Sequence, residues 1–188
     1  IAALGAGNFL GWFKGKIKRI VLVAIISILS LQAYSFLNYY FNIYPLKDSH
    51  EWQYGMKQVT AFVKSHPEYN QVFVTDIRSQ PYIFFLFYFK MPLQQYLSTV
   101  IYNRLEESNK YNLVSSFDGF YVASTGQPRT ITLYFGGWDP IESLPSSGVL
   151  YVLSPSQYDG LKRRNDFSVR EIIHNPDGGD AFFLVSAN

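Results

Sequence analysis

The chain of 188 residues contains no cysteine, and this absence removes several kinds of chemistry at once. Disulfide bonds, thiolate nucleophiles and cysteine-ligated metal ions are all excluded. The sequence also has only three histidines, without metal-ligand spacing, and it lacks a Gly-x-Ser-x-Gly elbow, a P-loop and an Asn-x-Ser/Thr acceptor. The common signatures of a catalytic centre are therefore missing, and we predict no metal site and no cofactor in this chain.

Charged residues are absent from residues 20–46, and acidic residues are absent from everything before Asp48. The apolar centre of this stretch is residues 20–37, and about 20 helical residues cross a hydrocarbon layer of about 30 Å. The stretch is longer than the apolar part of a signal peptide and ends in bulky aromatic residues. It therefore predicts a retained transmembrane helix. Four basic residues stand directly before it: Lys14, Lys16, Lys18 and Arg19.

The two flanks of this helix predict its orientation. Basic residues favour the cytoplasmic side, where they meet anionic lipid, whereas aromatic residues such as Tyr39, Tyr40 and Tyr44 favour the headgroup layer at the other end. Residues 1–13 are uncharged, and we interpret them as the end of a preceding membrane helix. We therefore expect a multi-pass protein of the cell membrane, with a membrane region over residues 1–44 and an extracytoplasmic domain over residues 45–188. The alternative is an anchor with a single span.

The part of the chain after Tyr44 is long enough for one globular domain. It carries 12 basic and 14 acidic residues, a net charge of −2. Proteins that bind nucleic acid normally present a basic face, so we predict no nucleic-acid partner.

The order of apolar and turn-forming segments predicts a three-layer α/β domain with a mixed sheet, in which a mostly parallel centre is followed by an antiparallel C-terminal hairpin. Short apolar runs predict buried strands at residues 71–75 and 149–153. The turn Asn-Pro-Asp-Gly-Gly-Asp predicts a hairpin between residues 167–174 and 181–186. Two further strands are expected at residues 119–124 and 130–135.

Two helices of this domain have distinctive sequences. Asp48 and Glu51 are spaced as a capping box, which predicts a helix over residues 49–65. The second helix, PYIFFLFYF from Pro81 to Phe89, is apolar on every face. Such a helix is either buried on all sides or lies against membrane or another protein. Residues 93–100 predict a third short helix, and residues 103–110 are polar and helical or coiled.

The best cluster of polar side chains follows the strand at residues 71–75. In α/β sheets, ligands gather beyond the carboxyl ends of the strands, and a carboxylate, a guanidinium and an amide at this position can hold a sugar hydroxyl or a phosphate. The alternative is a local ion pair with a helix cap. The candidate substrate-binding residues are Asp76, Arg78, Gln80 and Tyr82.

Several segments resemble the C-terminal end of bacterial polytopic glycosyltransferases. They are residues 44–45, 51–57, 72–75, 80–88 and the closing hairpin at residues 175–185. The group concerned is similar to the dolichyl-phosphate-mannose protein mannosyltransferases and aminoarabinose transferases, within the C-type membrane glycosyltransferases. In that group the essential acidic residue lies near the N-terminus, and no position of this chain matches it, so the resemblance implies no catalytic residue here.

The resemblance implies a fragment of an enzyme that takes a sugar from a polyprenyl-phosphate carrier and passes it to an acceptor outside the cytoplasm. The expected partners are membrane lipid, preceding transmembrane helices of the same polypeptide, a lipid-linked sugar and its acceptor. The domain after the last span would cover the site or select the acceptor. The alternative is a membrane-anchored extracytoplasmic binding, sensor or scaffold domain without catalysis.

Overall fold

The computed structural model describes residues 12–75, 80–103, 114–136, 147–161, 163 and 165–188. The chain divides into two compact units, Ile1–Lys47 and Asp48–Asn188. The expected preceding helix end at residues 1–13 falls almost entirely outside the described residues, as does the polar segment at residues 103–110.

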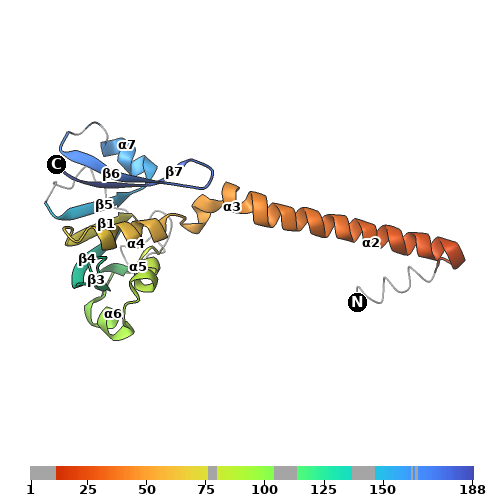
Figure 1. Cartoon of the computed structure of the whole chain (residues 1–188), viewed down its shortest axis with the longest axis horizontal. Helices are drawn as coiled ribbons and strands as arrows, with labels where there is room; N and C mark the ends of the chain where they lie inside the picture. Colours follow the sequence, from red (N-terminus) through yellow and green to blue (C-terminus); the bar gives the residue numbers. More distant parts are fainter. Residues whose placement is uncertain (1–11, 76–79, 104–113, 137–146, 162, 164) are drawn as a thin grey trace. The chain divides into compact units, whose positions relative to one another are not determined.

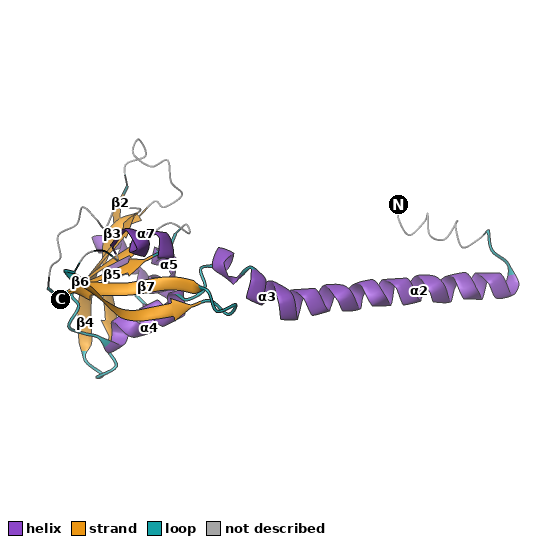
Figure 2. Ribbon diagram, turned by 90° about the horizontal axis from the view of Figure 1, so that it is seen from above, coloured by secondary structure: helices purple, strands orange, loops and turns teal. Residues whose placement is uncertain are grey.

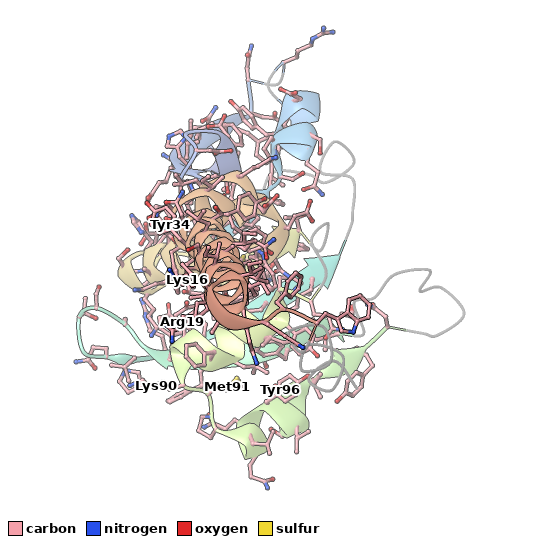
Figure 3. All side chains as sticks on the ribbon, turned by 90° about the vertical axis from the view of Figure 1, so that its right-hand side faces the viewer. Lys16, Arg19, Tyr34, Lys90, Met91 and Tyr96 are labelled. Atoms are coloured by element: carbon pink, nitrogen blue, oxygen red, sulfur yellow. The ribbon has the colours of Figure 1, made fainter. Side chains whose placement is uncertain are left out.

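The first unit is dominated by one continuous helical stretch. Helix α2 (Gly15–Asn38) continues into the π-helical turn η1 (Tyr39–Ile43) and helix α3 (Tyr44–Lys47), and no residue of α2 is buried. The 33 residues of Gly15–Lys47 form a helix that is long and apolar enough to span a membrane. Figure 2 shows α2 as one uninterrupted rod, and Figure 3 looks along it and shows side chains on all sides.

Aromatic rings stack along the last turns of this helical stretch. The ring of Tyr40 lies 5.9 Å from that of Phe36 and 6.0 Å from that of Tyr44. Tyr39 also contacts Tyr44, at 6.3 Å between centroids. The aromatic residues expected in the headgroup layer therefore form a cluster of contacting rings at the C-terminal end of the helix. Such a cluster suits a membrane–water interface.

The second unit is built on a mixed sheet of seven strands in the order β2-β3-β4-β1-β5-β7-β6 (Figure 1). Only the central strands β4, β1 and β5 are parallel, and both flanks are antiparallel. The predicted parallel centre and C-terminal hairpin are confirmed, and the two further strands expected at residues 119–124 and 130–135 are present as the antiparallel pair β3 and β4. The strands are β1 (Gln71–Thr75), β2 (Ile101–Tyr102), β3 (Val114–Val122), β4 (Pro128–Gly136), β5 (Val149–Leu153), β6 (Phe167–His174) and β7 (Asp180–Ala187).

Helices cover both faces of this sheet. Helices α4 (Met56–Ser65), α5 (Tyr82–Phe89) and α6 (Leu93–Thr99) contribute to the larger core, and α7 (Pro155–Leu161) packs over the smaller one. The alternation of strand side chains sends Val72 and Val74 into the larger core and Phe73 toward the smaller one. The sheet is therefore the middle layer between two apolar cores.

The helix expected over residues 49–65 is interrupted. A 3-10 turn, η2 (Ser49–Trp52), comes first, then Gln53 and Gly55 adopt positive φ angles of 53° and 98°, and α4 starts only at Met56. The side chain of Asp48 makes no capping hydrogen bond, so the capping-box prediction was wrong. A side chain at residue 55 would meet Ile173 and Phe182 at 3.0 Å, and this close packing explains the glycine.

Helix α5 is neither buried on all sides nor wholly exposed. Phe85 and Phe89 lie in the larger core, where their rings meet edge to face at 5.4 Å. On the opposite side, 49% of Ile83 and 72% of Phe87 are exposed. The helix therefore has one apolar face in the core and one apolar face that is exposed.

Candidate functional site

The two ends of the sheet differ in which ends of the parallel strands they present. Strands β1, β4 and β5 all end at one side, which we call the carboxyl edge, and begin at the other, the amino edge. Helix α4 begins beside the carboxyl edge, because Gly55 packs on Ile173 and Phe182 near the β6–β7 turn. It ends beside the amino edge, where the carbonyl of Lys64 accepts a hydrogen bond from the amide of Ser124.

The predicted polar cluster lies at the carboxyl edge and is described in part. Asp76 and Arg78 lie outside the described residues, whereas Gln80 and Tyr82 are brought together. The hydroxyl of Tyr82 donates a hydrogen bond of 3.0 Å to Oε1 of Gln80. This contact holds the amide of Gln80 in one orientation just beyond the end of β1.

Aromatic rings extend this cluster into the core. The ring of Tyr82 stacks on that of Tyr96 at 6.4 Å and meets Phe135 edge to face at 6.3 Å. Burial raises the pKa of Tyr96 to about 12, and the neighbouring Tyr102 and Tyr82 add to the shift. At neutral pH Tyr96 is therefore a protonated phenol, which serves as a hydrogen-bond donor and not as a base.

A pocket of about 570 Å³ lies at the amino edge, in a place the sequence did not indicate. Its volume is within the usual range for small-molecule sites. It is formed where the end of α4, the loop before β1, the start of β5 and the end of β7 meet. It is lined by Phe62, His66, Glu68, Tyr69, Ser147, Gly148, Arg170, Ser186, Ala187 and Asn188.

One wall of this pocket is aromatic. The imidazole of His66 stacks on the ring of Phe62 at 3.8 Å, and Tyr69 lies 6.4 Å from Phe62. Nδ1 of His66 lies 2.9 Å from the carbonyl oxygen of Phe62. Because a carbonyl only accepts, Nδ1 carries the proton in this hydrogen bond.

The opposite wall is polar. Nε of Arg170 donates to Oγ of Ser186 at 2.6 Å, and its Nη2 donates to the carbonyl of Ala187 at 3.2 Å. These two bonds fix the guanidinium plane on the β6–β7 ribbon and leave further N–H donors of Arg170 to a ligand. With Glu68 nearby, the pocket offers ring faces, donors and acceptors, a combination that suits a hydroxyl-rich small molecule such as a sugar.

Residues far apart in sequence make up both places. Tyr96 and the pocket residues belong to no local sequence motif. Contact between two helices brings Tyr96 to Tyr82, and the pairing of β6 with β7 helps to bring the pocket residues together. Among the described residues, no group of three or more His, Asp or Glu side chains is arranged to hold a metal ion.

Comparison of the chain with known protein families, characterised proteins and solved structures finds no match.

Proposed function

We propose that this chain is the C-terminal portion of an integral-membrane glycosyltransferase, which moves a sugar from a polyprenyl-phosphate donor to an acceptor outside the cytoplasm. In this proposal the second unit covers the site or selects the acceptor. The observation that carries the proposal is the direction of the first elements of the second unit: α4 runs from the carboxyl edge to the amino edge, and β1 runs back.

The lengths of α4 and β1 make this return nearly complete. Helix α4 has 10 residues and is about 15 Å long, and β1 has 5 residues and spans about 17 Å. The carboxyl edge, with Gln80 and Tyr82, therefore lies at the same end of the domain as Gly55, close in the chain to the end of the apolar helix at Lys47. This is the edge at which α/β sheets usually bind ligands.

A lipid-linked donor restricts where in the protein its binding groups can lie. Its phosphate and sugar stay at headgroup depth, so the groups that bind them must lie at that depth too. The 33-residue helix Gly15–Lys47 is about 50 Å long, enough for the hydrocarbon core and headgroup layers of about 40–45 Å together. The second unit starts at Asp48, the residue directly after this helix.

The proposal is tested with full-length protein in membrane vesicles that contain a polyprenyl-phosphate sugar and a candidate acceptor. We expect sugar transfer, and we expect Gln80→Ala and Tyr82→Phe to reduce it or to change the preferred acceptor, because the pair faces the edge where the donor would lie. Thr125→Ser, in the turn at the amino edge, is the matched control. Absence of transfer with every polyprenyl-phosphate sugar tested, or unchanged transfer and acceptor preference in both variants, would refute the proposal.

The pocket at the amino edge favours a second candidate, a membrane-anchored binding domain without catalysis. Its aromatic wall and its Arg170 suit a saccharide in solution. This candidate predicts that the full chain in detergent binds a soluble oligosaccharide, and that Arg170→Met weakens binding while Gln80→Ala does not. Saccharide titrations followed by calorimetry measure both effects, and equal effects of the two variants would refute this candidate.

A further inference from the structure

The guanidinium of Arg170 is held at the wall of the amino-edge pocket through one of its two hydrogen-bonding sides. Nε donates to Oγ of Ser186 and Nη2 donates to the carbonyl of Ala187, and both acceptor residues line the pocket together with Arg170. These bonds use the two N–H groups on the Nε side of the planar group. The guanidinium is therefore already in place before a ligand arrives, which lowers the cost of binding.

The second side of this guanidinium is a fork of two parallel N–H donors, one from Nη1 and the other from Nη2. In the described part of the chain, Arg170 forms no ion pair. Such a fork matches the two oxygens of a carboxylate and binds them through two parallel hydrogen bonds. The free side of Arg170 therefore suits an acidic group on a ligand.

The aromatic wall of the same pocket is rigid. Phe62 and Tyr69 belong to the larger core and are only 7% and 8% exposed. The half-buried imidazole of His66 stacks on Phe62 at 3.8 Å and lies 6.3 Å from the ring of Tyr69. Because the buried rings hold the imidazole in place, the wall offers a fixed ring surface, against which the apolar face of a sugar ring can pack.

We propose that the amino-edge pocket binds an acidic saccharide, whose carboxylate is held by the free fork of Arg170 and whose ring packs against His66. This inference rests on the second candidate function, saccharide binding, and names the class of saccharide. It does not depend on sugar transfer. A neutral saccharide would leave the fork without the partner that fits it best.

Glu68 is the acidic side chain of the pocket, and it favours a saccharide over a simple acid. It forms no ion pair with any residue that the structure describes, and its carboxylate only accepts hydrogen bonds. Sugar hydroxyls can donate to it, whereas a ligand that consists of an acidic group alone offers it no donor. The alternative ligand is a zwitterion such as an amino acid, whose ammonium group would bind Glu68.

The test compares two forms of the same saccharide. The full chain in detergent is titrated by calorimetry with oligosaccharides of galacturonic acid and of glucuronic acid, each alongside its methyl ester, which has the same rings but no charge. We expect one of the acids to bind about 10- to 100-fold more tightly than its ester, the range that a hydrogen bond to a charged group provides. In Arg170→Met the acid should bind no better than the ester. Each comparison is made within one protein, so a change in the shape of the pocket affects both ligands alike.

Three further variants serve as controls. Arg170→Lys keeps the positive charge without the fork and should recover only part of the preference for the acid. Lys57→Met removes a positive charge from the start of α4, at the carboxyl edge, and should leave the preference unchanged. Glu68→Gln should not weaken binding of the acid, because the removed charge has the same sign as the carboxylate of the ligand and the amide keeps one acceptor oxygen.

Four outcomes overturn the proposal. Equal affinities of the unaltered chain for the acids and their esters would leave only neutral saccharide binding. A preference for the acid that survives in Arg170→Met would place the carboxylate elsewhere. A loss in Glu68→Gln as large as that in Arg170→Met would indicate a zwitterionic ligand. Absence of binding for acids and esters alike would refute the second candidate function as well, whereas sugar transfer in vesicles tests the transferase separately.

Discussion

Gly55 offers the sharpest test of how the start of α4 packs on the rest of the second unit. Its φ of 98° lies in a region that side chains with a Cβ rarely adopt, and an added Cβ would lie 3.0 Å from Cγ2 of Ile173 and from Cδ2 of Phe182. Both neighbours are core residues on the β6–β7 ribbon, with 4% and 2% exposure. The substitution Gly55→Ala therefore introduces backbone strain and crowding at the same point.

The two costs can be separated by a matched glycine. Backbone strain at a positive φ costs about 1–2 kcal/mol, and crowding in a packed core adds about 1–3 kcal/mol. Gly126 also has a positive φ, of 80°, but no atom lies within 4 Å of the position of its Cβ. We expect Gly55→Ala to lower the free energy of unfolding by about 2–5 kcal/mol, and Gly126→Ala by only about 1–2 kcal/mol. Against a typical total of about 5–15 kcal/mol, the first loss is large.

Urea denaturation of the full chain in detergent, followed by near-ultraviolet circular dichroism, measures both values because the aromatic core of the second unit gives the signal. The double variant Gly55→Ala/Ile173→Ala should be less destabilised than the sum of its two single variants, since removal of Cγ2 makes room for the new methyl group. Equal losses for the two glycine variants, or strict additivity in the double variant, would show that the close contact with Ile173 does not constrain residue 55.

Three other variants test separate parts of the structure. Phe85→Ala should cost about 3–5 kcal/mol because it leaves a cavity in the core, whereas Phe87→Ala, on the open side of α5, should change stability by less than about 0.5 kcal/mol; urea denaturation in detergent compares them, and similar losses would contradict the assigned faces. The pKa of Tyr96 is raised from 10.0 to about 12, so protonated Tyr96 stabilises the fold fully below about pH 10, and this contribution, on the order of 2 kcal/mol, is lost as the pH rises to about 12. Tyr96→Phe should flatten that fall in a series of urea titrations across this pH range, and an unchanged slope would refute it. Arg170→Ala removes two hydrogen bonds to the end of β7, including that to Ser186, at an exposed position. We expect the free energy of unfolding to fall by about 1 kcal/mol or less in the same assay. A loss several times larger would mean that the guanidinium supports the core.

Local patterns predicted the regular elements well where the pattern and the packing agree. The apolar runs at residues 71–75 and 149–153 are β1 and β5 at the expected positions, because β-branched side chains suit strands that are covered on both faces. The first strand of the closing hairpin, residues 167–174, also has the expected bounds. The long apolar helix followed from composition and length alone.

The predictions failed where distant contacts decide the local structure. The spacing of Asp48 and Glu51 indicated one helix, but the chain turns at Gln53 and Gly55 to fit against a hairpin more than a hundred residues later. The short strand β2 exists only because its two residues pair with β3. Such contacts produce no periodic pattern in the sequence of the segment whose structure they determine.

In the candidate sites, too, the sequence indicated the local contacts and missed the distant ones. Gln80 and Tyr82 were found because they follow a predicted strand, and two residues of separation suffice for their hydrogen bond. Tyr96 joins them through a ring contact between two helices, which no spacing rule indicates. The pocket at the amino edge needs Phe62 from α4 and Arg170 from β6, so only the folded sheet creates it.

The two candidate functions place different demands on the two edges of the same sheet. Because α4 runs from the carboxyl edge to the amino edge and β1 runs back, Gln80 and Tyr82 lie at the same edge as Gly55, while the pocket lies at the far end of α4, about 15 Å away. In the proposed transferase the donor would bind at the carboxyl edge, whereas in the proposed binding domain a soluble ligand would occupy the pocket at the amino edge. Substitutions at Tyr82 and at Arg170 therefore act on separable sites, and an effect of both on one activity would require a ligand long enough to extend from the carboxyl edge to the pocket.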